Sequence, residues 1–368
     1  MRIALATRSL TRGGAQVQLF NLATGLARRG HAVTVVVLYE GGALHSELER
    51  AGIDVICLEK RRRWDVLMPL VRYLAITRHA RFNVIYSFLP LENLFSLVVA
   101  RYSGAALVWG LRGAAQDVKQ FGYASQFLYW AQRRLMSAPD RVISNSVAAL
   151  LEIGVVPGGR FAVVPNGLDV ARFRPDPTAR SRVRAELRVS DDQLLVGCVA
   201  RLDSIKDHST LLRAVALVAA RRPDIKVAIV GSGPSDYQAS LMRIAQVLGM
   251  EETVSWLGAR SDVERLMNGF DVYVSASQAE GFSNSLAEAM ACGVVPVVTD
   301  VGDSAFVVGT HGAVVPTKRP DLLADAVLTW LERDTPELRL ARRQRIVNEF
   351  GIERMIESSL DTLSAAAR

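Results

Sequence analysis

The feature that most constrains the fold is an alternation of short apolar runs with longer amphipathic ones along almost the whole chain. The strand-like runs of the first half are RIALATRS, AVTVVVLY, DVICLEK, VIYSFLP, ALVWGLRG, RVISNS and FAVVPNG. Those of the second half are LLVGCVARL, KVAIVGSGP, TVSWLGA, DVYVSAS, VPVVTD and HGAVVP. Helix-like stretches separate them. Such alternation predicts parallel sheets with helices on both faces.

One interruption divides the alternation into two parts. The segment PNGLD at 165–169 is followed by the turn-rich FRPDPTA, and a new series of strands and helices then begins. A chain of 368 residues is long enough for two domains of ordinary size. We therefore predict an α/β protein of two doubly wound, Rossmann-like domains, 1–169 and 170–351, that face each other across a cleft. The ligand is expected where the strands end.

Composition bears on where the protein works. The sequence has no run of about 18 uncharged apolar residues, which a membrane-spanning helix would need. Its three cysteines stand singly in apolar surroundings, and this pattern favours reduced thiols in a cytoplasmic protein. The cysteines have no metal-ligand spacing and the sequence has no Asp-x-Asp motif, so neither a metal nor another cofactor is expected.

Charge is unevenly divided between the two halves. Residues 1–170 hold 20 Lys and Arg against 11 Asp and Glu, a net +9, whereas the remainder holds 24 against 26, a net −2. The first domain is therefore expected to face an anionic surface. The cluster Lys60-Arg61-Arg62-Arg63 beside Trp64 favours a membrane over nucleic acid, because it lacks interleaved stacking aromatics. A solvated loop is the alternative, and the amphipathic segment 126–136 is a second place for membrane contact.

The stretch EGFSNSLAE, residues 280–288, carries the densest set of candidate binding groups. It follows the strand-like DVYVSAS and leads into a helix that Gly293 ends. Free backbone N–H groups at such a helix start bind phosphate, and two glutamates, Glu280 and Glu288, bracket them. Hydroxyl groups of a nucleotide sugar need such acceptors. The alternative for Glu288 is a capping box with Ser285.

Other strand ends carry further candidates. Arg201 and Lys206 follow LLVGCVA and provide two cations for a diphosphate, although Asp203 and Asp207 could simply neutralise them. Gly231 begins a tight turn after KVAIV. Gly13-Gly14 precedes the first helix, but G-x-G-x-x-G is absent, which argues against a dinucleotide oxidoreductase.

In this order and spacing, the segments VARLDSIKDHSTLLRA, IVGSGP, WLG and EGFSNSLAEAMACGVVPVVTDVG resemble retaining glycosyltransferase family 4 of the GT-B fold. GGAQVQLFNLATGLARRGHAV and PNGLD match the same family's glycine loop and domain junction. The resemblance covers nearly the whole chain. It implies that the last helix, residues 352–368, returns to the first domain.

The resemblance also assigns roles. It implies that Arg201 and Lys206 hold and stabilise the departing diphosphate, that Glu280 meets the donor sugar, and that Glu288 binds the ribose. The remaining donor-side positions implied are Gly14, Gly231, Leu257, Gly281, Phe282, Ser283 and Asn284. Many relatives carry a histidine after the fifth strand; here Arg112 or a neighbour takes that place. Arg112 is thus expected on the acceptor side, or paired with Asp117.

These roles imply a retaining transferase that moves a sugar from a nucleotide diphosphate, UDP-linked, to a lipid-linked or polysaccharide acceptor in surface glycan biosynthesis, lipopolysaccharide included. The expected location is peripheral on the inner face of the plasma membrane, with no nucleic-acid partner. Two alternatives remain open: a GT-B enzyme that epimerises UDP-N-acetylglucosamine, and a sugar-nucleotide sensor without turnover.

Overall fold

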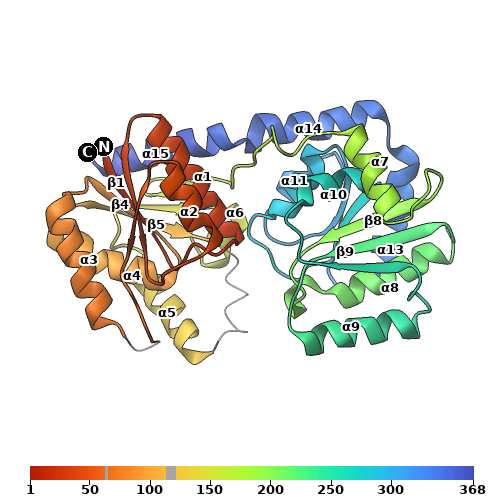
Figure 1. The fold of residues 1–368 in the computed structure, drawn as a ribbon, viewed down its shortest axis with the longest axis horizontal. Coiled ribbons are helices and arrows are strands. Elements are labelled where there is room, and N and C mark those ends of the chain that lie inside the picture. The colour runs from red at the N-terminus through yellow and green to blue at the C-terminus, as the bar shows by residue number, and fades with distance from the viewer. Residues whose placement is uncertain (63–64, 113–121) are drawn as a thin grey trace. The chain divides into compact units, whose positions relative to one another are not determined.

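A computed structural model describes residues 1–62, 65–112 and 122–368. The chain divides into two compact units (Figure 1). Unit 1 comprises Met1–Gly167 and Ile352–Arg368, and unit 2 comprises Leu168–Gly351. The predicted boundary after residue 169 falls two residues later than this division. Two parallel-sheet units confirm the predicted fold class.

Unit 1 is built on a seven-stranded parallel sheet in the order β3-β2-β1-β4-β5-β6-β7. Its strands are β1 (Arg2–Thr7), β2 (Ala32–Val37), β3 (Asp54–Cys57), β4 (Val84–Phe88), β5 (Ala106–Leu111), β6 (Arg141–Ser144) and β7 (Phe161–Val163). Its helices are α1 (Gly14–Arg28), α2 (Ala43–Arg50), α3 (Leu67–Ala80), α4 (Pro90–Ser103), α5 (Tyr123–Arg134), α6 (Val147–Glu152) and α15 (Ile352–Ala366).

Both faces of this sheet are covered, as the apolar strands require. On one face α1, α2 and α15 pack in a core that includes Leu22, Leu48 and Ile356. On the other face α3 and α4 supply Tyr73 and Val99. Because neighbouring strands are parallel, each helix that connects two strands carries the chain from the carboxyl edge of the sheet back to its amino edge.

Unit 2 has a six-stranded parallel sheet in the order β10-β9-β8-β11-β12-β13. Its strands are β8 (Leu194–Val199), β9 (Ile225–Val230), β10 (Val254–Gly258), β11 (Val272–Ser275), β12 (Val295–Thr299) and β13 (Ala313–Val315). Its helices are α7 (Pro177–Glu186), α8 (His208–Ala219), α9 (Ser235–Val247), α10 (Val263–Gly269), α11 (Asn284–Ala291), α12 (Ser304–Val308), α13 (Pro320–Arg333) and α14 (Pro336–Phe350), with a 3₁₀ turn, η2, at Ser204–Lys206.

Helix α7 begins at Pro177, inside the segment FRPDPTA that was predicted to be turn-rich, and continues to Glu186. Pro177 occupies its first turn, and the side chain of Asp176 accepts a hydrogen bond from Ala179 N at 3.0 Å. Proline is favourable in the first turn that follows an N-cap residue. The last residues of FRPDPTA therefore form the beginning of a helix.

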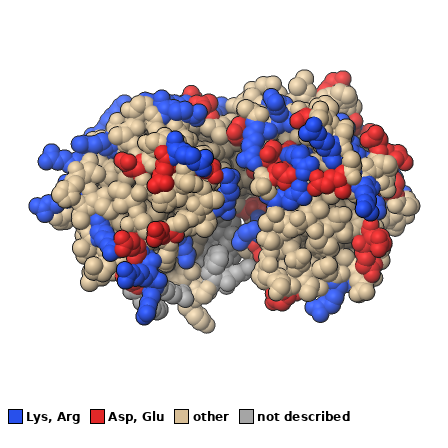
Figure 2. All heavy atoms as spheres, viewed as in Figure 1, with Lys and Arg blue, Asp and Glu red and all other residues tan. Residues whose placement is uncertain are grey.

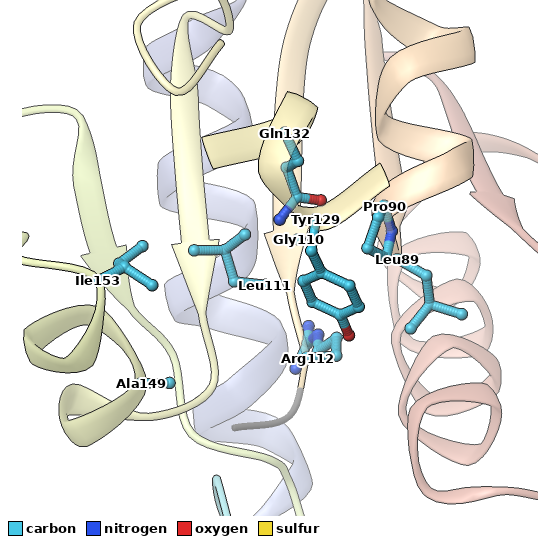
Figure 3. A pocket seen from close by; sticks show the side chains of 9 residues that line it. All are labelled: Leu89, Pro90, Gly110, Leu111, Arg112, Tyr129, Gln132, Ala149 and Ile153. Carbon is cyan, nitrogen blue, oxygen red and sulfur yellow. The ribbon is translucent and has the colours of Figure 1, made fainter. Parts of the chain in front are cut away.

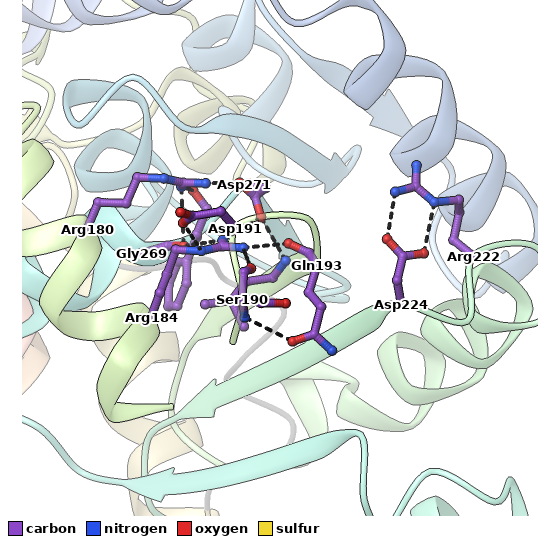
Figure 4. A network of polar contacts seen from close by, with 11 residues as sticks. Arg180, Arg184, Ser190, Asp191, Gln193, Arg222, Asp224, Gly269 and Asp271 are labelled. Carbon is purple, nitrogen blue, oxygen red and sulfur yellow. Dashed lines mark hydrogen bonds and ion pairs between the residues drawn. The ribbon is translucent and has the colours of Figure 1, made fainter. Parts of the chain in front are cut away.

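A polar network fixes the beginning of β11 against β8 (Figure 4). Asp271 accepts hydrogen bonds from Leu195 N at 2.8 Å and from Arg184 Nη1 at 3.0 Å, and Arg180 Nη2 lies 2.6 Å from its other oxygen. Arg184 is buried and also donates to the carbonyls of Ser190 and Gln193. The network aligns the amino ends of β8 and β11, and the candidate site lies at the carboxyl ends of the same two strands.

Candidate donor-binding site

The candidate site of unit 2 lies at the point where the strand order reverses. Strands β8 and β11 are neighbours in the sheet, but the chain leaves them in opposite directions. In doubly wound sheets the loops that leave such neighbours diverge and open a binding crevice at their carboxyl ends. Lys206 follows β8 and Glu280 follows β11, so the topology brings together residues 74 positions apart.

Lys206 and Glu280 form an ion pair at this position. The ammonium Nζ of Lys206 lies 2.6 Å from Glu280 Oε1, and the side chains are 17% and 13% exposed. Ser277 Oγ donates to the same oxygen at 2.8 Å. The sequence predicted both charged residues but not their pairing. No pattern in the sequence singled out Ser277.

Several hydrogen bonds hold the loops of this pair together. Asp207 adopts a left-handed conformation at φ 43° and caps α8 by accepting from Thr210 N at 3.2 Å. Gln278 Nε2 donates to Asp207 Oδ2 at 3.0 Å, and Gln278 N donates to Ile205 O at 2.7 Å. Burial alone would raise the pKa of Asp207, but hydrogen bonds from Ser209, Thr210 and Gln278 hold it below its usual value.

Arg201 differs from Lys206 in its surroundings. Its side chain is 78% exposed and lies 3.0 Å from Asp203 Oδ2. An exposed pair of this kind is weak and exchanges partners readily. Arg201 can therefore turn toward an anion at the same strand end without leaving a buried charge unpaired.

The turn after β9 packs directly on the loop that carries Arg201. Gly231 has φ +147°, and a Cβ there would lie 1.8 Å from the carbonyl oxygen of Ala200. Leu202 N also donates to Ser232 O at 3.0 Å. The glycine predicted for the donor site is thus required for the close approach of two strand-end loops. Leu257, also predicted, is partly buried near the end of edge strand β10.

Helix α11 begins beside the ion pair. Its N-cap is Ser283, whose side chain makes no capping hydrogen bond, and Asn284 is the first helical residue. Gly281 and Ser283 are buried, while the ring of Phe282 packs 5.4 Å from that of Phe350. At positions 281–283, a ligand would therefore meet backbone groups more than side chains.

The capping-box interpretation of Ser285 and Glu288 is wrong. Because the helix begins at Asn284, Glu288 lies one turn inside it. The hydroxyl of Ser285 lies 2.8 Å from that of Tyr273 and is engaged there. Burial raises the pKa of Glu288 to about 7. A carboxyl group with no capping role remains available to a ligand.

Arg112, which the sequence predicted for the acceptor side, lies in unit 1. Arg112 Nη1 donates to Asn166 Oδ1 at 3.0 Å, Nη2 donates to Tyr86 OH at 2.8 Å, and the guanidinium stacks 4.7 Å from the centre of the Phe88 ring. It borders a small pocket with Leu89, Pro90, Gly110, Tyr129 and Gln132 (Figure 3). Asp117, the alternative partner, lies outside the described residues.

Gly14 is the first residue of α1 and is exposed, and its N-cap Gly13 brings no side-chain cap. The start of this helix therefore leaves backbone N–H groups open to an anion. Within unit 1, it follows β1, which lies beside β4 where that sheet also reverses order.

The basic cluster at 60–63 differs from its prediction. Lys60 is 5% exposed, and its ammonium donates to the carbonyls of Arg62 at 2.8 Å and Asp65 at 2.5 Å. It stabilises its own loop and does not face solvent. Arg61 and Arg62 are exposed, whereas residues 63–64 lie outside the described part.

The described ranges contain no group of three residues suited to hold a metal ion, and no helix among them has the length and apolar character to cross a bilayer.

Comparison with known proteins agrees with this architecture. A family model described as Glycosyltransferase Family 4 matches residues 12–172, and one described as Glycosyl transferases group 1 matches residues 193–333. The chain belongs to glycosyltransferase family 4, and its fold is of the GT-B class.

The individual curated relatives have low sequence identity to this chain. D-inositol 3-phosphate glycosyltransferase of Mycolicibacterium gilvum (strain PYR-GCK) is 31% identical over 203 residues, which are 52% of this chain and 45% of that protein. The gpi3 subunit of phosphatidylinositol N-acetylglucosaminyltransferase of Schizosaccharomyces pombe (strain 972 / ATCC 24843) is 24% identical over 86% of this chain and 69% of that one. The chain spans about half the length of the first curated relatives it matches.

Among solved structures, Anabaena Alr3699/HepE in complex with UDP has a TM-score of 0.85 and 23% identity, covering 99% of this chain and 100% of that one. The same protein has also been solved with UDP-glucose. At 23% identity, the similarity between this chain and that structure is evidence for a shared fold alone.

Proposed function

We propose that this chain is a retaining glycosyltransferase that moves a sugar from a UDP-linked donor to a lipid-linked or polysaccharide acceptor. The observation that carries the proposal is the Lys206–Glu280 pair at the order reversal of unit 2. It holds a partly exposed ammonium in the same strand-end loop as the exposed Arg201. Two cations at one strand end, one held by Glu280 and the other in an exposed pair, suit a departing diphosphate. Donor complexes of a protein of the same fold support the choice of UDP.

In the proposed reaction, the bond between the sugar and the donor phosphate breaks as the acceptor oxygen attacks from the same face. The leaving diphosphate accepts the proton from the acceptor hydroxyl. Lys206 and Arg201 stabilise the negative charge that develops on the diphosphate. Glu280 Oε1 already accepts from Lys206 and Ser277, so we assign it to orient Lys206 and the sugar, not to act as a nucleophile.

Glu288 is assigned to the ribose hydroxyls, and backbone groups of residues 281–284 are assigned to sugar and phosphate. On the acceptor side, we assign Arg112 to an anionic group of the acceptor. Its guanidinium contacts two neutral partners, Asn166 and Tyr86, in the contacts that the structure describes. Such contacts orient the charge without neutralising it.

The proposed pathway is surface glycan assembly at the inner face of the plasma membrane, with no metal or other cofactor. The acceptor would then be presented at a lipid surface. The excess positive charge of the first 170 residues supports this location.

The test is titration calorimetry with UDP, with UDP-glucose transfer assayed in parallel. Arg201→Ala and Lys206→Ala should each weaken UDP binding by roughly 1.5–3 kcal/mol, the scale of a charged hydrogen bond. Arg221→Ala is the matched control, because Arg221 forms an exposed 2.6 Å pair with Asp325 in the same unit. Unchanged UDP affinity in both site variants, each folded, would reject the assignment.

Product analysis separates the alternatives. A transferase needs an acceptor and keeps the anomeric configuration of the donor. An epimerase instead yields an isomeric sugar nucleotide without an acceptor, and a sensor binds UDP-glucose and leaves it intact.

A further inference from the structure

The surface charges of the visible face do not single out a binding site, because basic and acidic side chains are interspersed there (Figure 2). The pocket beside Arg112 in unit 1 is more specific (Figure 3). Leu89 follows β4, Arg112 follows β5 and Ala149 lies in α6 after β6, so the pocket lies at the carboxyl edge of the sheet. Its volume is about 50 Å³, several times the roughly 10–15 Å³ that one water molecule needs. The pocket therefore has room for a small substituent of a ligand.

A chain of buried hydrogen bonds ends at the wall of this pocket. Ser87 of β4 and Asn93 of α4 are fully buried, and Gln132 of α5 is 6% exposed. Ser87 Oγ donates to Asn93 Oδ1 at 2.7 Å. Asn93 Nδ2 donates to Gly110 O of β5 at 3.2 Å and to Gln132 Oε1 at 2.8 Å. These bonds connect two strands and two helices around the pocket.

The same bonds determine which end of the Gln132 amide faces the pocket. The Gly110 carbonyl can only accept, so the Asn93 atom beside it must be the amide nitrogen. That nitrogen also donates to Gln132, so the Gln132 atom that it meets must be the oxygen. The amide nitrogen, Nε2, then points the other way, and in Figure 3 it lies on the side of Leu111. It makes no hydrogen bond to the parts of the chain that the structure describes.

The polar groups of Gln132 and Arg112 at this pocket are donors. Gln132 Nε2 carries two N–H groups, and leaving such donors unpaired in a nearly buried position is unfavourable. Arg112 Nε is also buried, and it has no hydrogen-bond partner within residues 1–62, 65–112 and 122–368. Both side chains therefore require acceptor atoms from a ligand.

The rest of the lining decides which acceptor group fits. It is mostly aliphatic and consists of Leu89, Pro90, Leu111, Ala149 and Ile153. Such walls favour an apolar group, and a carboxylate among them would lose its hydration. An acetamido group supplies both parts, because its methyl group suits the aliphatic walls and its carbonyl oxygen accepts from the Gln132 amide. A hydroxyl group would leave the walls without a contact.

Arg112 borders the same pocket, and the proposed function assigns it to an anionic group of the acceptor. Figure 3 shows the hydroxyl of Tyr129 on the side of Arg112, one helical turn before Gln132. In an N-acetylhexosamine that is joined to phosphate at its anomeric carbon, the acetamido group and the phosphate stand on adjacent carbon atoms. One sugar can therefore place its acetamido group in the pocket and its phosphate beside Arg112.

We propose that this pocket is an acceptor subsite that selects an N-acetylhexosamine joined to phosphate at its anomeric carbon. Gln132 donates to the acetamido carbonyl, the aliphatic walls hold the methyl group, and Arg112 binds the phosphate. The inference rests on the proposed transfer to a lipid-linked acceptor, and it names the class of sugar that this acceptor carries. Gln132 is then a residue that determines acceptor specificity.

The experiment is an NMR titration of the whole protein with saturating UDP, so that the probes do not occupy the donor site. The probes are two matched pairs: N-acetylglucosamine 1-phosphate with glucose 1-phosphate, and N-acetylgalactosamine 1-phosphate with galactose 1-phosphate. In at least one pair, the acetamido sugar should bind about tenfold or more tightly, because its partner leaves the Gln132 donors unpaired. Absence of binding by both acetamido sugars, or equal affinities within both pairs, would overturn the proposal. Tighter binding of glucuronic acid 1-phosphate would also overturn it, since the pocket would then take a carboxylate.

Two variants test the pocket itself, at about pH 8, where an introduced carboxyl group is ionised. Gln132→Glu keeps an oxygen for Asn93 but places a second acceptor against the acetamido carbonyl, so it should abolish the preference within the pair. Ala149→Leu fills the aliphatic wall and leaves the hydrogen-bonded chain intact, and it should reduce the same preference. Gln246→Glu, at an exposed position of α9 in unit 2, is the matched control and should keep the preference in full.

Thermal unfolding and calorimetry with UDP are measured on the same samples. UDP affinity should be unchanged in all three variants, so a failure of the subsite is distinguishable from a failure of donor binding. If Gln132→Glu does not fold, Ala149→Leu decides alone, because Ala149 lies outside the chain of buried hydrogen bonds. Full retention of the preference in the folded variants would show that the acetamido group binds elsewhere.

Discussion

At the scale of single residues, the candidate site depends on one ion pair that local sequence cannot specify. Lys206 has acidic residues only one and three positions away, Asp207 and Asp203, yet its ammonium contacts Glu280. Asp207 is unavailable because its oxygens accept from Ser209, Thr210 and Gln278. Asp203 caps the 3₁₀ turn and pairs with Arg201. Asp203 and Asp207 thus each have partners of their own, and Lys206 pairs with Glu280 at the carboxyl end of the strands.

Glu288 gives a prediction that depends on pH. Burial raises its pKa in the folded protein to about 7, above the usual 4.5 of a glutamate. Between these two values, the folded state holds a proton that the unfolded state releases, so the carboxyl lowers stability as pH rises through this window. We expect the free energy of unfolding to fall less from about pH 5 to about pH 8 in Glu288→Gln than in the unmodified protein, by urea titration.

The same variant tests the ribose assignment. If Glu288 accepts from ribose hydroxyls as a carboxylate, the loss of UDP affinity in Glu288→Gln should be larger at about pH 8 than at about pH 6, where the group is mostly protonated. The terminal phosphate of UDP titrates near pH 6 in the measurements on both proteins. The difference in UDP affinity between the unmodified protein and the variant therefore isolates the effect of the Glu288 carboxyl group. An affinity loss that is independent of pH would contradict this role.

At the scale of elements, the alternation of strands and helices was predictable because each buried strand is nearly continuous in apolar residues. The order of strands was not, since β8 pairs with both β9 and β11 through similar Val-rich surfaces. That order decides which loops meet, so the pairing of Lys206 with Glu280 could not follow from the sequence. The burial of Lys60 was not predicted for a related reason: it depends on the conformation of the loop, which local sequence does not specify.

The loop after β12 supports the loop that carries Glu280. Gly302 has φ +56°, and a Cβ there would lie 2.4 Å from Glu280 O and 2.5 Å from Gly281 O. Gly302→Ala should therefore displace residues 280–281 and weaken binding of UDP-glucose. Gly249→Ala is the control, because Gly249 has φ +67° with nothing within 4 Å of its Cβ position. It should cost only about 1–2 kcal/mol for the left-handed conformation and leave binding unchanged.

The two variants are compared by thermal unfolding and by UDP-glucose titration. Equal effects of both substitutions on affinity would show that the backbone conformation, and not the contact with residues 280–281, explains the loss.

At the scale of the whole molecule, the chain builds two hydrophobic cores in each unit and returns its last helix to unit 1. Helix α15 buries Met355, Ile356 and Leu363 in the core that also contains α1 and α2. Arg29 on the helix-ending turn of α1 pairs with Glu353 at 2.7 Å. Unit 1 is therefore completed by residues that are synthesised after all of unit 2.

This organisation predicts that the two units can be destabilised separately. Ile356 is fully buried, so Ile356→Ala should lower the stability of unit 1 by about 2–5 kcal/mol through lost burial and the cavity that remains. Asp361→Ala, at an exposed position of the same helix, is the control. If UDP binds unit 2 as proposed, calorimetric unfolding with and without UDP identifies the transition of unit 2 as the one that UDP raises. We expect Ile356→Ala to lower the other transition and to leave the UDP-dependent one, and UDP affinity, as they are. If the substitution lowers both transitions equally, the units unfold as one and α15 stabilises the entire molecule.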